Sequence, residues 1–331
     1  MIVLGIESSC DETAAALVRD GRTILASVVA SQEEVHHRYG GVVPELASRR
    51  HMEAILPVMR EALAQADIGL AQIDAVAATR GPGLIGSLLV GFSFAKALAF
   101  ALRVPWVGVN HLEGHIHALF LEPSPPPFPF VALLASGGHT GLYFVSSFMS
   151  MELLGQTRDD AAGEAFDKVA KMLGWGYPGG AVIDRLARQG DPNRVRFPRP
   201  LIEKTSCDFS FSGIKTAVGR YLREHPGGSP SQAVDIAAGF QEAVVEVLVL
   251  KLIRAARMKG CHRVALAGGV AANSRLRERL RQDGGAEGME VYLPSPRLCG
   301  DNAAMVAALG YRLLDSGEPA GLEDDVFSRV G

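Results

Sequence analysis

The stretch IVLGIESSCDETAAALV, residues 2–18, decides the fold that we expect for this chain. It reads as a buried apolar strand, a polar turn ending at Thr13, and a second apolar strand. Residues 131–145, VALLASGGHTGLYFV, repeat the pattern with a turn that ends at Thr140. A hairpin whose tip exposes backbone N–H groups can hold a phosphate. The repeat predicts a duplicated core whose two hairpin tips face each other across a cleft.

Strands and helices alternate outward from both stretches, which predicts an α/β fold. The expected further strands cover residues 24–29, 73–79, 106–109, 263–267 and 290–293. The expected helices cover residues 44–66, 84–102, 160–173 and 235–259, with others beginning near residues 111, 181, 274 and 301. Residues 191–213 are polar and contain proline, and they predict an extended excursion.

Two lobes are expected, because 331 residues exceed the usual size of a single hydrophobic core. Five prolines between Glu122 and Pro129 can continue neither a helix nor a central strand, so this run is the predicted linker. We expect an N-terminal lobe at residues 1–125 and a C-terminal lobe at 126–300. A C-terminal helix, residues 301–331, is expected to pack back on the N-terminal lobe.

Composition indicates a soluble cytoplasmic protein. Its net charge is −3, so any nucleic-acid contact must come from a local basic patch or from a partner. Four well-separated cysteines without a CxxC pair favour a reducing compartment and no disulfide framework. The sequence has no signal-peptide pattern. Residues 84–102 are nearly long enough to span a bilayer, but they include Lys96 and several serines and glycines, so we expect a buried core helix and no membrane contact.

Gly81, Gly83 and Gly86 match GxGxxG between a predicted strand and a predicted helix. The dinucleotide-binding fingerprint also needs an acid about 20 residues further on. The first acid after these glycines is Glu113, so we interpret them as a tight turn with close helix packing. No GxxxxGK[ST] motif occurs, which argues against a Walker-type nucleotide site.

His111 and His115 are spaced i, i+4, which places both imidazoles on one face of a helix, where they can bind one metal. A solvated helix with scattered histidines is the alternative. His117 should point elsewhere. A zinc protease needs HExxH, and Glu113 does not follow the first histidine directly, which counts against that activity. Asp301 is a candidate third ligand that spacing alone does not identify.

Other polar positions leave two interpretations open. The turn at residues 136–139 and the segment Gly268–Gly269 with Asn273 are either ligand-binding loops or ordinary turns. The acids at the ends of apolar elements are helix caps or catalysts: Asp11, Glu12, Asp167, Asp184 and Asp301. The arginine clusters are solvated faces or phosphate contacts: Arg49 and Arg50; Arg194, Arg196 and Arg199; and Arg275, Arg277, Arg279 and Arg281.

Taken together, these motifs resemble the bacterial TsaD family of tRNA threonylcarbamoyl transferases, once called glycoproteases. The resemblance covers the chain in order and rests on ten stretches: GIESSCDET (5–13), GVVPE (41–45), GPGL (81–84), NHLEGH (110–115), SGGHT (136–140), GEAFDK (163–168), YPGG (177–180), FSFSG (209–213), GGVAAN (268–273) and GDNA (300–303). Ala135 stands where the family often has valine, a small change in a loop that contacts ligand through its backbone.

The resemblance implies an actin/sugar-kinase-like two-lobed fold with a duplicated core and an inter-lobe cleft. It implies transfer of a threonylcarbamoyl group from threonylcarbamoyl-AMP to N6 of the adenosine 3′ of the anticodon, in tRNAs that read codons beginning with A. The implied metal ligands are His111, His115 and Asp301, holding one divalent ion, with Fe²⁺ preferred over Zn²⁺. The implied adenylate-binding positions are Leu134, Ala135, Ser136, Gly137, Gly138, Asp167, Gly180, Asp184 and Asn273.

The resemblance also implies partners: the TsaB paralogue, the TsaE ATPase and an upstream TsaC-type synthase. Because AMP is a good leaving group, no covalent nucleophile is needed, and positioning with charge stabilisation suffices. Our hypothesis gives Asp11 the role of steering or deprotonating the attacking amine. The alternatives are a metalloprotease and a non-catalytic ATP-binding regulatory module.

Overall fold

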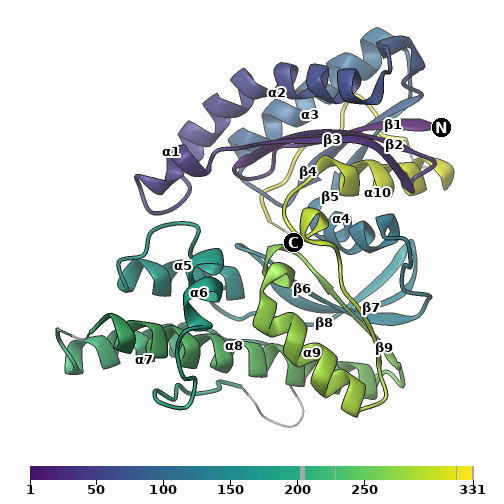
Figure 1. Ribbon diagram of the computed structural model, residues 1–331. Coiled ribbons are helices and arrows are strands. Elements are labelled where there is room, and N and C mark those ends of the chain that lie inside the picture. Colours follow the sequence, from purple (N-terminus) through teal and green to yellow (C-terminus); the bar gives the residue numbers. More distant parts are fainter. Residues whose placement is uncertain (202–205, 228, 318, 330–331) are drawn as a thin grey trace. The chain divides into compact units, whose positions relative to one another are not determined.

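The computed structural model describes residues 1–201, 206–227, 229–317 and 319–329 (Figure 1). The chain divides into two compact units. Unit 1 comprises residues 1–125 and 300–331, and unit 2 comprises residues 126–299.

Unit 1 is built on a five-stranded sheet in the order β3-β2-β1-β4-β5. β1 pairs antiparallel with β2, and β2 with β3, whereas β1, β4 and β5 are parallel. The central strands are apolar on both faces because both faces are buried. The bounds are β1 (Ile2–Glu7), β2 (Glu12–Arg19), β3 (Thr23–Ser31), β4 (Ala75–Gly81) and β5 (Trp106–Asn110).

Helices cover both faces of this sheet. α2 (Pro44–Ala66) and α3 (Ile85–Leu102) lie on one face, and α10 (Ala303–Asp315) lies on the other (Figure 1). Two short helices, α1 (Glu33–His37) and α4 (His111–His117), follow β3 and β5. The single turns η1 (Leu70–Gln72) and η2 (Ala118–Leu121) complete the unit.

Unit 2 repeats the strand arrangement of unit 1. Its sheet has the order β10-β9-β6-β7-β8, in which the hairpin β6–β7 continues antiparallel to β8 and runs parallel to β9 and β10 on its other side. The bounds are β6 (Phe130–Ala135), β7 (Thr140–Ser147), β8 (Ser150–Gln156), β9 (Arg263–Ala267) and β10 (Glu290–Tyr292). Both hairpins that the sequence predicts are therefore present, each at the centre of its own sheet, and the duplicated core is confirmed.

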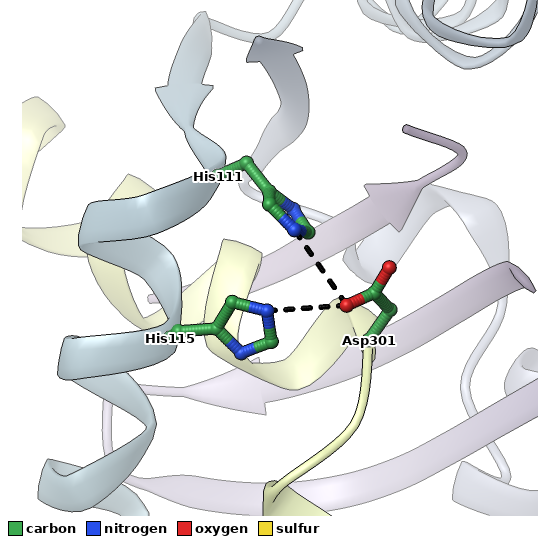
Figure 2. Close-up of side chains that lie close together, drawn as sticks. All are labelled: His111, His115 and Asp301. Atoms are coloured by element: carbon green, nitrogen blue, oxygen red, sulfur yellow. Dashed lines mark ion pairs between the residues drawn. The ribbon is translucent and has the colours of Figure 1, made fainter. Parts of the chain in front are cut away.

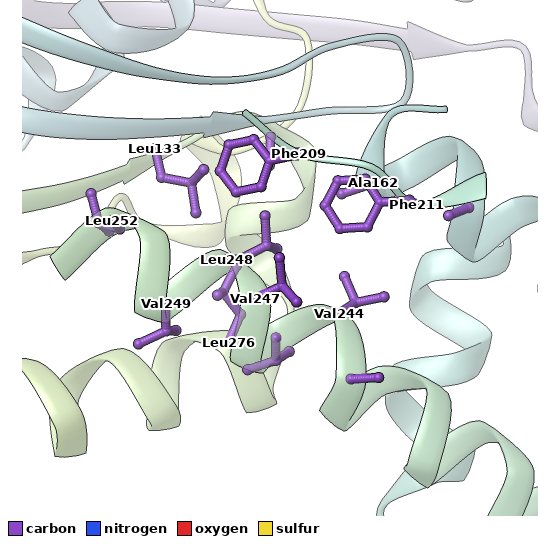
Figure 3. Packing of buried hydrophobic residues seen from close by; sticks show 14 of the residues in the cluster. Leu133, Ala162, Phe209, Phe211, Val244, Val247, Leu248, Val249, Leu252 and Leu276 are labelled. Atoms are coloured by element: carbon purple, nitrogen blue, oxygen red, sulfur yellow. The ribbon is translucent and has the colours of Figure 1, made fainter. Parts of the chain in front are cut away.

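The core of unit 2 lies between this sheet and the long helix α8 (Pro230–Met258). Figure 3 shows Leu248 and Leu252 of α8 on the side of Leu133 and Phe209, and Val244 of α8 facing Phe211. The remaining helices and turns are α5 (Ala162–Met172), α6 (Gly179–Ala187), α7 (Ser212–Glu224), α9 (Ser274–Ala286), η3 (Gly269–Ala272) and η4 (Pro296–Leu298).

Several elements differ from the prediction. The short helix α1 is additional, and so is α7, which begins at Ser212 within the last residues of the expected excursion 191–213. α8 begins five residues earlier than expected, at residue 230. α7 buries Ile214 and Val218, an i, i+4 pair, against unit 2. β8 is also additional; it is an edge strand with largely exposed side chains, so its apolar pattern is weak. Residues 202–205 of the expected excursion lie outside the described residues.

Only 33% of the apolar helix α3 is buried. Leu88, Phe92 and Ala95 are covered, whereas Leu89 is 42% exposed and Phe100 is 73% exposed. The expectation of a buried core helix is therefore wrong for one face. Within the described ranges, α3 alone has the length and hydropathy of a membrane span, and a helix that packs on a globular core can meet the same two criteria.

Candidate functional site

The end of β5 fixes the start of α4 and with it the two histidines. The Asn110 side-chain oxygen accepts hydrogen bonds from the backbone N–H groups of Leu112 and Glu113, at 2.9 and 3.3 Å, and so caps the helix. His111 is the first helical residue and His115 lies one turn later. Both imidazoles are buried, and their ring centroids are 4.7 Å apart.

Asp301 reaches the same place from the far end of the sequence. It stands just before α10, whose first turn is capped by the Asn302 side chain accepting from the Met305 N–H at 2.9 Å. Asp301 Oδ1 lies 3.1 Å from His115 Nε2 and 3.6 Å from His111 Nε2 (Figure 2). One ligand atom from each of the three residues falls within 4.8 Å of the others.

These three residues fit a divalent metal. Within the described ranges neither ring nitrogen of His115 makes a hydrogen bond, although the residue is 1% exposed, and Nε2 has only its ion-pair contact with Asp301. A buried imidazole without a hydrogen bond is costly unless another group engages its lone pair. Two histidines and one carboxylate with open positions are a ligand set found for Fe(II) and also accepted by zinc.

Acidic side chains crowd around the same point. Burial, followed by the nearby carboxylates of Asp301 and Asp11, raises the pKa of Glu12 to about 10. Like charges repel strongly where water is excluded, so this group of acids favours the neutral form of one member or the presence of a cation. Glu12, for which the sequence left a helix cap and a catalyst open, is absent from the predicted site residues but lies within this group of acids.

His111 has partners of its own. Its Nδ1 lies 3.1 Å from Glu7 Oε2 and 3.2 Å from Ser9 Oγ. Burial acts to lower the pKa of His111, but the carboxylates of Asp301 and Glu7 outweigh it and raise the pKa to about 9. Glu7 is absent from the predicted site residues; its only sequence signal is an acid at the last position of a buried apolar strand.

Asp11 lies in the turn between β1 and β2 and is 8% exposed. Its backbone carbonyl accepts from the Gln32 N–H at 3.1 Å. Two further side chains of the histidine motif are outside the cluster. His117 turns back to donate from Nδ1 to the Glu113 carbonyl at 2.9 Å, and Glu113 is not among the clustered ligand groups. A protease arrangement of two histidines and an adjacent glutamate base is not formed.

In unit 2, the predicted adenylate-binding positions gather at one edge of the sheet. Leu134 and Ala135 end β6, and Gly268 follows the parallel strand β9, so their carboxyl ends share that edge. A β-carbon on Gly268 would come within 2.4 Å of the Ala135 carbonyl oxygen. The two loops therefore touch through their backbones.

The tip of the β6–β7 hairpin is a closed turn with free space around its glycines. The Ser136 N–H donates to the His139 carbonyl at 2.8 Å, and the Gly163 N–H donates to the Ser136 carbonyl at 3.1 Å. Added β-carbons on Gly137 and Gly138 would meet nothing within 4 Å. Since no contact inside the protein requires glycine at these two positions, the space is available to a ligand.

Asp167, Asp184 and Asn273 link the remaining loops. Asp167 accepts from the Gly179 N–H at 2.7 Å, next to Gly180. Asp184 accepts from the Ser274 N–H and hydroxyl, at 3.2 and 2.7 Å. Asn273 caps α9 by accepting from the Leu276 N–H at 2.9 Å. All the predicted positions of unit 2 thus belong to one connected set of loops.

The arginines of α9 are mostly occupied inside unit 2. Arg275 and Arg279 both pair with Glu242 of α8 at 2.7 Å, and Arg277 donates to the Ala271 and Pro294 carbonyls. These three side chains are half-buried and hold the helix in place, so a fully solvated face does not describe them. Arg281 is exposed.

Comparison with known proteins covers nearly the whole chain. A sequence model of the family described as "TsaD: tRNA N6-adenosine threonylcarbamoyltransferase" matches residues 23–308. A protein of that name from Desulforapulum autotrophicum is 62% identical, covering 100% of this chain and 99% of the relative. One from Syntrophus aciditrophicus is 57% identical, over 99% of this chain and 97% of the relative.

Solved structures with the same fold are much more distant in sequence. HypF from T. kodakarensis has a TM-score of 0.62 at 18% identity, covering 95% of this chain and 48% of HypF. Component A of the Acidaminococcus fermentans (R)-2-hydroxyglutaryl-CoA dehydratase has a TM-score of 0.56 at 17% identity, covering 94% of this chain and 98% of that protein. These likenesses place the chain among the actin-like, sugar-kinase-like folds.

Proposed function

Because the chain belongs to the TsaD family of tRNA-modifying transferases, we propose that it transfers a threonylcarbamoyl group from threonylcarbamoyl-AMP to N6 of the adenosine 3′ of the anticodon. The acceptors are tRNAs that read codons beginning with A. The observation that carries the proposal is the convergence of His111, His115 and Asp301 within one buried cluster, in a chain whose second unit gathers glycine loops at one sheet edge.

His111, His115 and Asp301 would hold one divalent ion, which we take to be Fe²⁺ ahead of Zn²⁺. When bound, such an ion supplies Lewis-acid stabilisation of negative charge on a phosphate or donor oxygen. The two imidazoles are preset for this by α4, which holds them one turn apart, and Asp301 is preset by the capped start of α10. The three ligand side chains therefore lose little conformational freedom when the ion binds.

The unit 2 loops are proposed to bind the adenylate. Backbone N–H groups around Gly137, Gly138 and Gly180 are accessible because no side chain of the protein fills the space beside these glycines. Leu134, Ala135 and Ser136 fix the hairpin tip. Asp167, Asp184 and Asn273 hold the neighbouring helix starts, so their contribution to the adenylate includes keeping the loops in register.

Asp11 is proposed to act on the attacking amine. Its position in the β1–β2 turn, next in sequence to Glu12, puts a carboxylate beside the acidic cluster. It would orient the N6 amine and accept its proton as the carbonyl carbon is attacked and AMP departs. An Asp11→Ala chain that bound adenylate and metal yet kept the single-turnover rate would remove this role.

The reaction is proposed to require the TsaB paralogue and the TsaE ATPase, with a TsaC-type synthase supplying the intermediate, all in the cytoplasm. An exposed apolar strip supports a protein partner. It runs over the neighbouring helices α2 and α3, with 39–62% exposure, and consists of Met52, Leu56, Ile85 and Leu89. Met52→Asp with Leu89→Asp should abolish co-purification with the paralogue, whereas Met258→Asp, at an exposed position of unit 2, serves as the matched control.

A reconstituted reaction tests the activity. Purified chain, partners, synthetic threonylcarbamoyl-AMP and a tRNA transcript are combined, and the digested nucleosides are measured by mass spectrometry. We expect threonylcarbamoylated adenosine only when the chain is present. Cleavage of a protein substrate sensitive to a chelator, without any tRNA product, would favour a metalloprotease. Adenylate binding without either product would favour a regulatory module.

A further inference from the structure

Glu7 has no assigned part in the site, yet it is the most enclosed carboxylate beside it. Its side chain is 0% exposed at the end of β1. We propose that Glu7 is a positioning residue that fixes the ring of His111 with its proton on Nδ1, so that Nε2 presents its lone pair toward Asp301 and a bound metal. This inference rests on the metal centre proposed above.

Hydrogen-bond donors hold both oxygens of the Glu7 carboxylate. Oε1 accepts from the Ser9 N–H at 2.6 Å, and Oε2 accepts from the Thr79 hydroxyl at 2.7 Å. His111 Nδ1 completes the set at 3.1 Å from Oε2. Ser9 belongs to the turn after β1, and Thr79 to the adjacent strand β4, so the carboxylate is held from two sides.

These contacts decide which ring nitrogen carries the proton. An ionised carboxylate can only accept hydrogen bonds. The Ser9 N–H and the Thr79 hydroxyl already donate to the two oxygens of Glu7, and such donors favour the ionised carboxylate. The His111 nitrogen that faces Glu7 must therefore be the donor. In a neutral imidazole the other nitrogen, Nε2, is then the one with a free lone pair.

The direction of Nε2 fits this assignment. It faces Asp301 Oδ1 at 3.6 Å, a separation that leaves room for an ion bound to both (Figure 2). Metal-binding histidines commonly donate their second N–H to a carboxylate, which fixes the tautomer and raises the basicity of the ligand nitrogen. His115 differs, because its Nδ1 is buried without a hydrogen-bond partner in the described parts of the chain. Glu7 therefore supports one of the two imidazoles selectively.

Ser9 is the competing partner. Its hydroxyl lies 3.2 Å from the same Nδ1, and a hydroxyl can donate or accept. If Ser9 donated to an unprotonated Nδ1, the proton would sit on Nε2 and metal binding through that atom would be blocked. This arrangement would also place the lone pair of His111 Nδ1 against a lone pair of Glu7 Oε2, which is unfavourable. The Ser9 hydroxyl is therefore expected to act as an acceptor or to turn away.

The test measures Zn²⁺ affinity of the full chain by competition with a chromophoric chelator. Glu7→Gln keeps the shape and removes the charge, and it should weaken Zn²⁺ binding about 10- to 100-fold, the usual effect of losing such a partner. Ser9→Ala is the matched control and should change the affinity by less than about 3-fold. Thr79→Val removes one donor to Glu7 and should fall between the two. Circular dichroism and thermal melting verify folding of each variant.

A second readout does not depend on any variant folding. In the Zn²⁺-loaded wild-type chain, ¹H–¹⁵N NMR of the imidazoles should give His111 a protonated Nδ1 and a metal-shifted Nε2. Unchanged Zn²⁺ affinity in folded Glu7→Gln, or an unprotonated Nδ1 on His111, would overturn the role of Glu7 while leaving the metal centre standing. Absence of Zn²⁺ and Fe²⁺ binding by the wild-type chain would instead remove the metal centre itself.

Discussion

Gly5 lies directly against the first turn of α10: a β-carbon built on Gly5 would come within 2.1 Å of the Ala303 carbonyl oxygen. Ala303 is two residues beyond Asp301, so this close approach of helix to strand is what brings the third ligand to α4. We predict that Gly5→Ala forces α10 outward, because the clash is with backbone that cannot turn aside. The expected cost is about 1–3 kcal/mol of unfolding free energy, with weaker metal binding, measured by chemical denaturation and metal titration.

Gly114→Ala is the matched control for Gly5→Ala. Gly114 lies between the two histidines in α4, but its added β-carbon would only touch the flexible Met305 side chain at 3.5 Å. Alanine is the better helix former by about 1 kcal/mol, so stability should be kept or increased and metal binding retained. Equal metal affinity in both variants would contradict the role given to the Gly5 contact.

Removing both imidazoles should remove the metal. His111→Ala combined with His115→Ala leaves Asp301 as the single remaining ligand of the cluster, which is too few to hold a divalent ion against buffer. We expect purified protein to lose stoichiometric iron or zinc, measured by inductively coupled plasma mass spectrometry. His117→Ala is the control, since His117 turns away to the Glu113 carbonyl. One metal retained per chain in the double variant would refute the assignment.

A second pair of buried histidines gives unit 1 a pH dependence. His51 Nδ1 lies 2.8 Å from Thr13 Oγ1, and Nε2 lies 3.0 Å from the Cys10 carbonyl. Burial lowers the pKa of His51, against opposing effects of the Cys10 carbonyl, Glu7 and Asp11, while His36 adds to the lowering. As the pH falls, His51 therefore gains its proton at a higher pH in the unfolded chain than in the folded chain.

The sign follows from that difference in proton uptake. Stability is complete above the unfolded pKa of about 6.5 and is lost as the pH falls from there toward the lower folded pKa. We predict that unfolding free energy decreases between pH 7 and pH 5, and that His51→Gln removes part of this slope while lowering stability at pH 7. Urea denaturation at several pH values measures it. An identical slope in the variant would exclude His51 as a source.

The hairpin tip of unit 2 offers a test of ligand binding that spares the fold. A side chain on Gly137 would enter space that is open in the protein. Gly137→Leu should therefore leave thermal stability nearly unchanged and weaken AMP binding at least about 10-fold by filling that space, measured by isothermal titration calorimetry. Gly285→Leu, equally open but within α9, is the control and should bind AMP normally. Normal binding by Gly137→Leu would place the adenylate elsewhere.

Several features of the molecule were readable before any coordinates. The apolar strand, polar turn and apolar strand at residues 2–18 and 131–145 predicted two hairpins, and these are β1–β2 and β6–β7. The i, i+4 spacing of His111 and His115 indicated that the two imidazoles share one face of a helix. Such local patterns are reliable because alternation and helical periodicity act between neighbouring residues. α7 was missed although its sequence signal is present: its apolar residues have the helical spacing i, i+3, i+4, i+7, i+8, and they are Ile214, Ala217, Val218, Tyr221 and Leu222.

Sequence by itself determined the family, the hairpins and the pairing of His111 with His115, since each depends on residues that are close in the chain. The family resemblance already implied Asp301 as the third ligand, but only the tertiary structure shows it beside the two imidazoles and shows Glu7 behind His111. Those contacts join residues separated by more than a hundred positions, and they exist because the parallel pairing of β1 with β4 and the packing of α10 on Gly5 bring distant segments to one point. No local pattern encodes that convergence, because packing depends on the shapes of both surfaces at once.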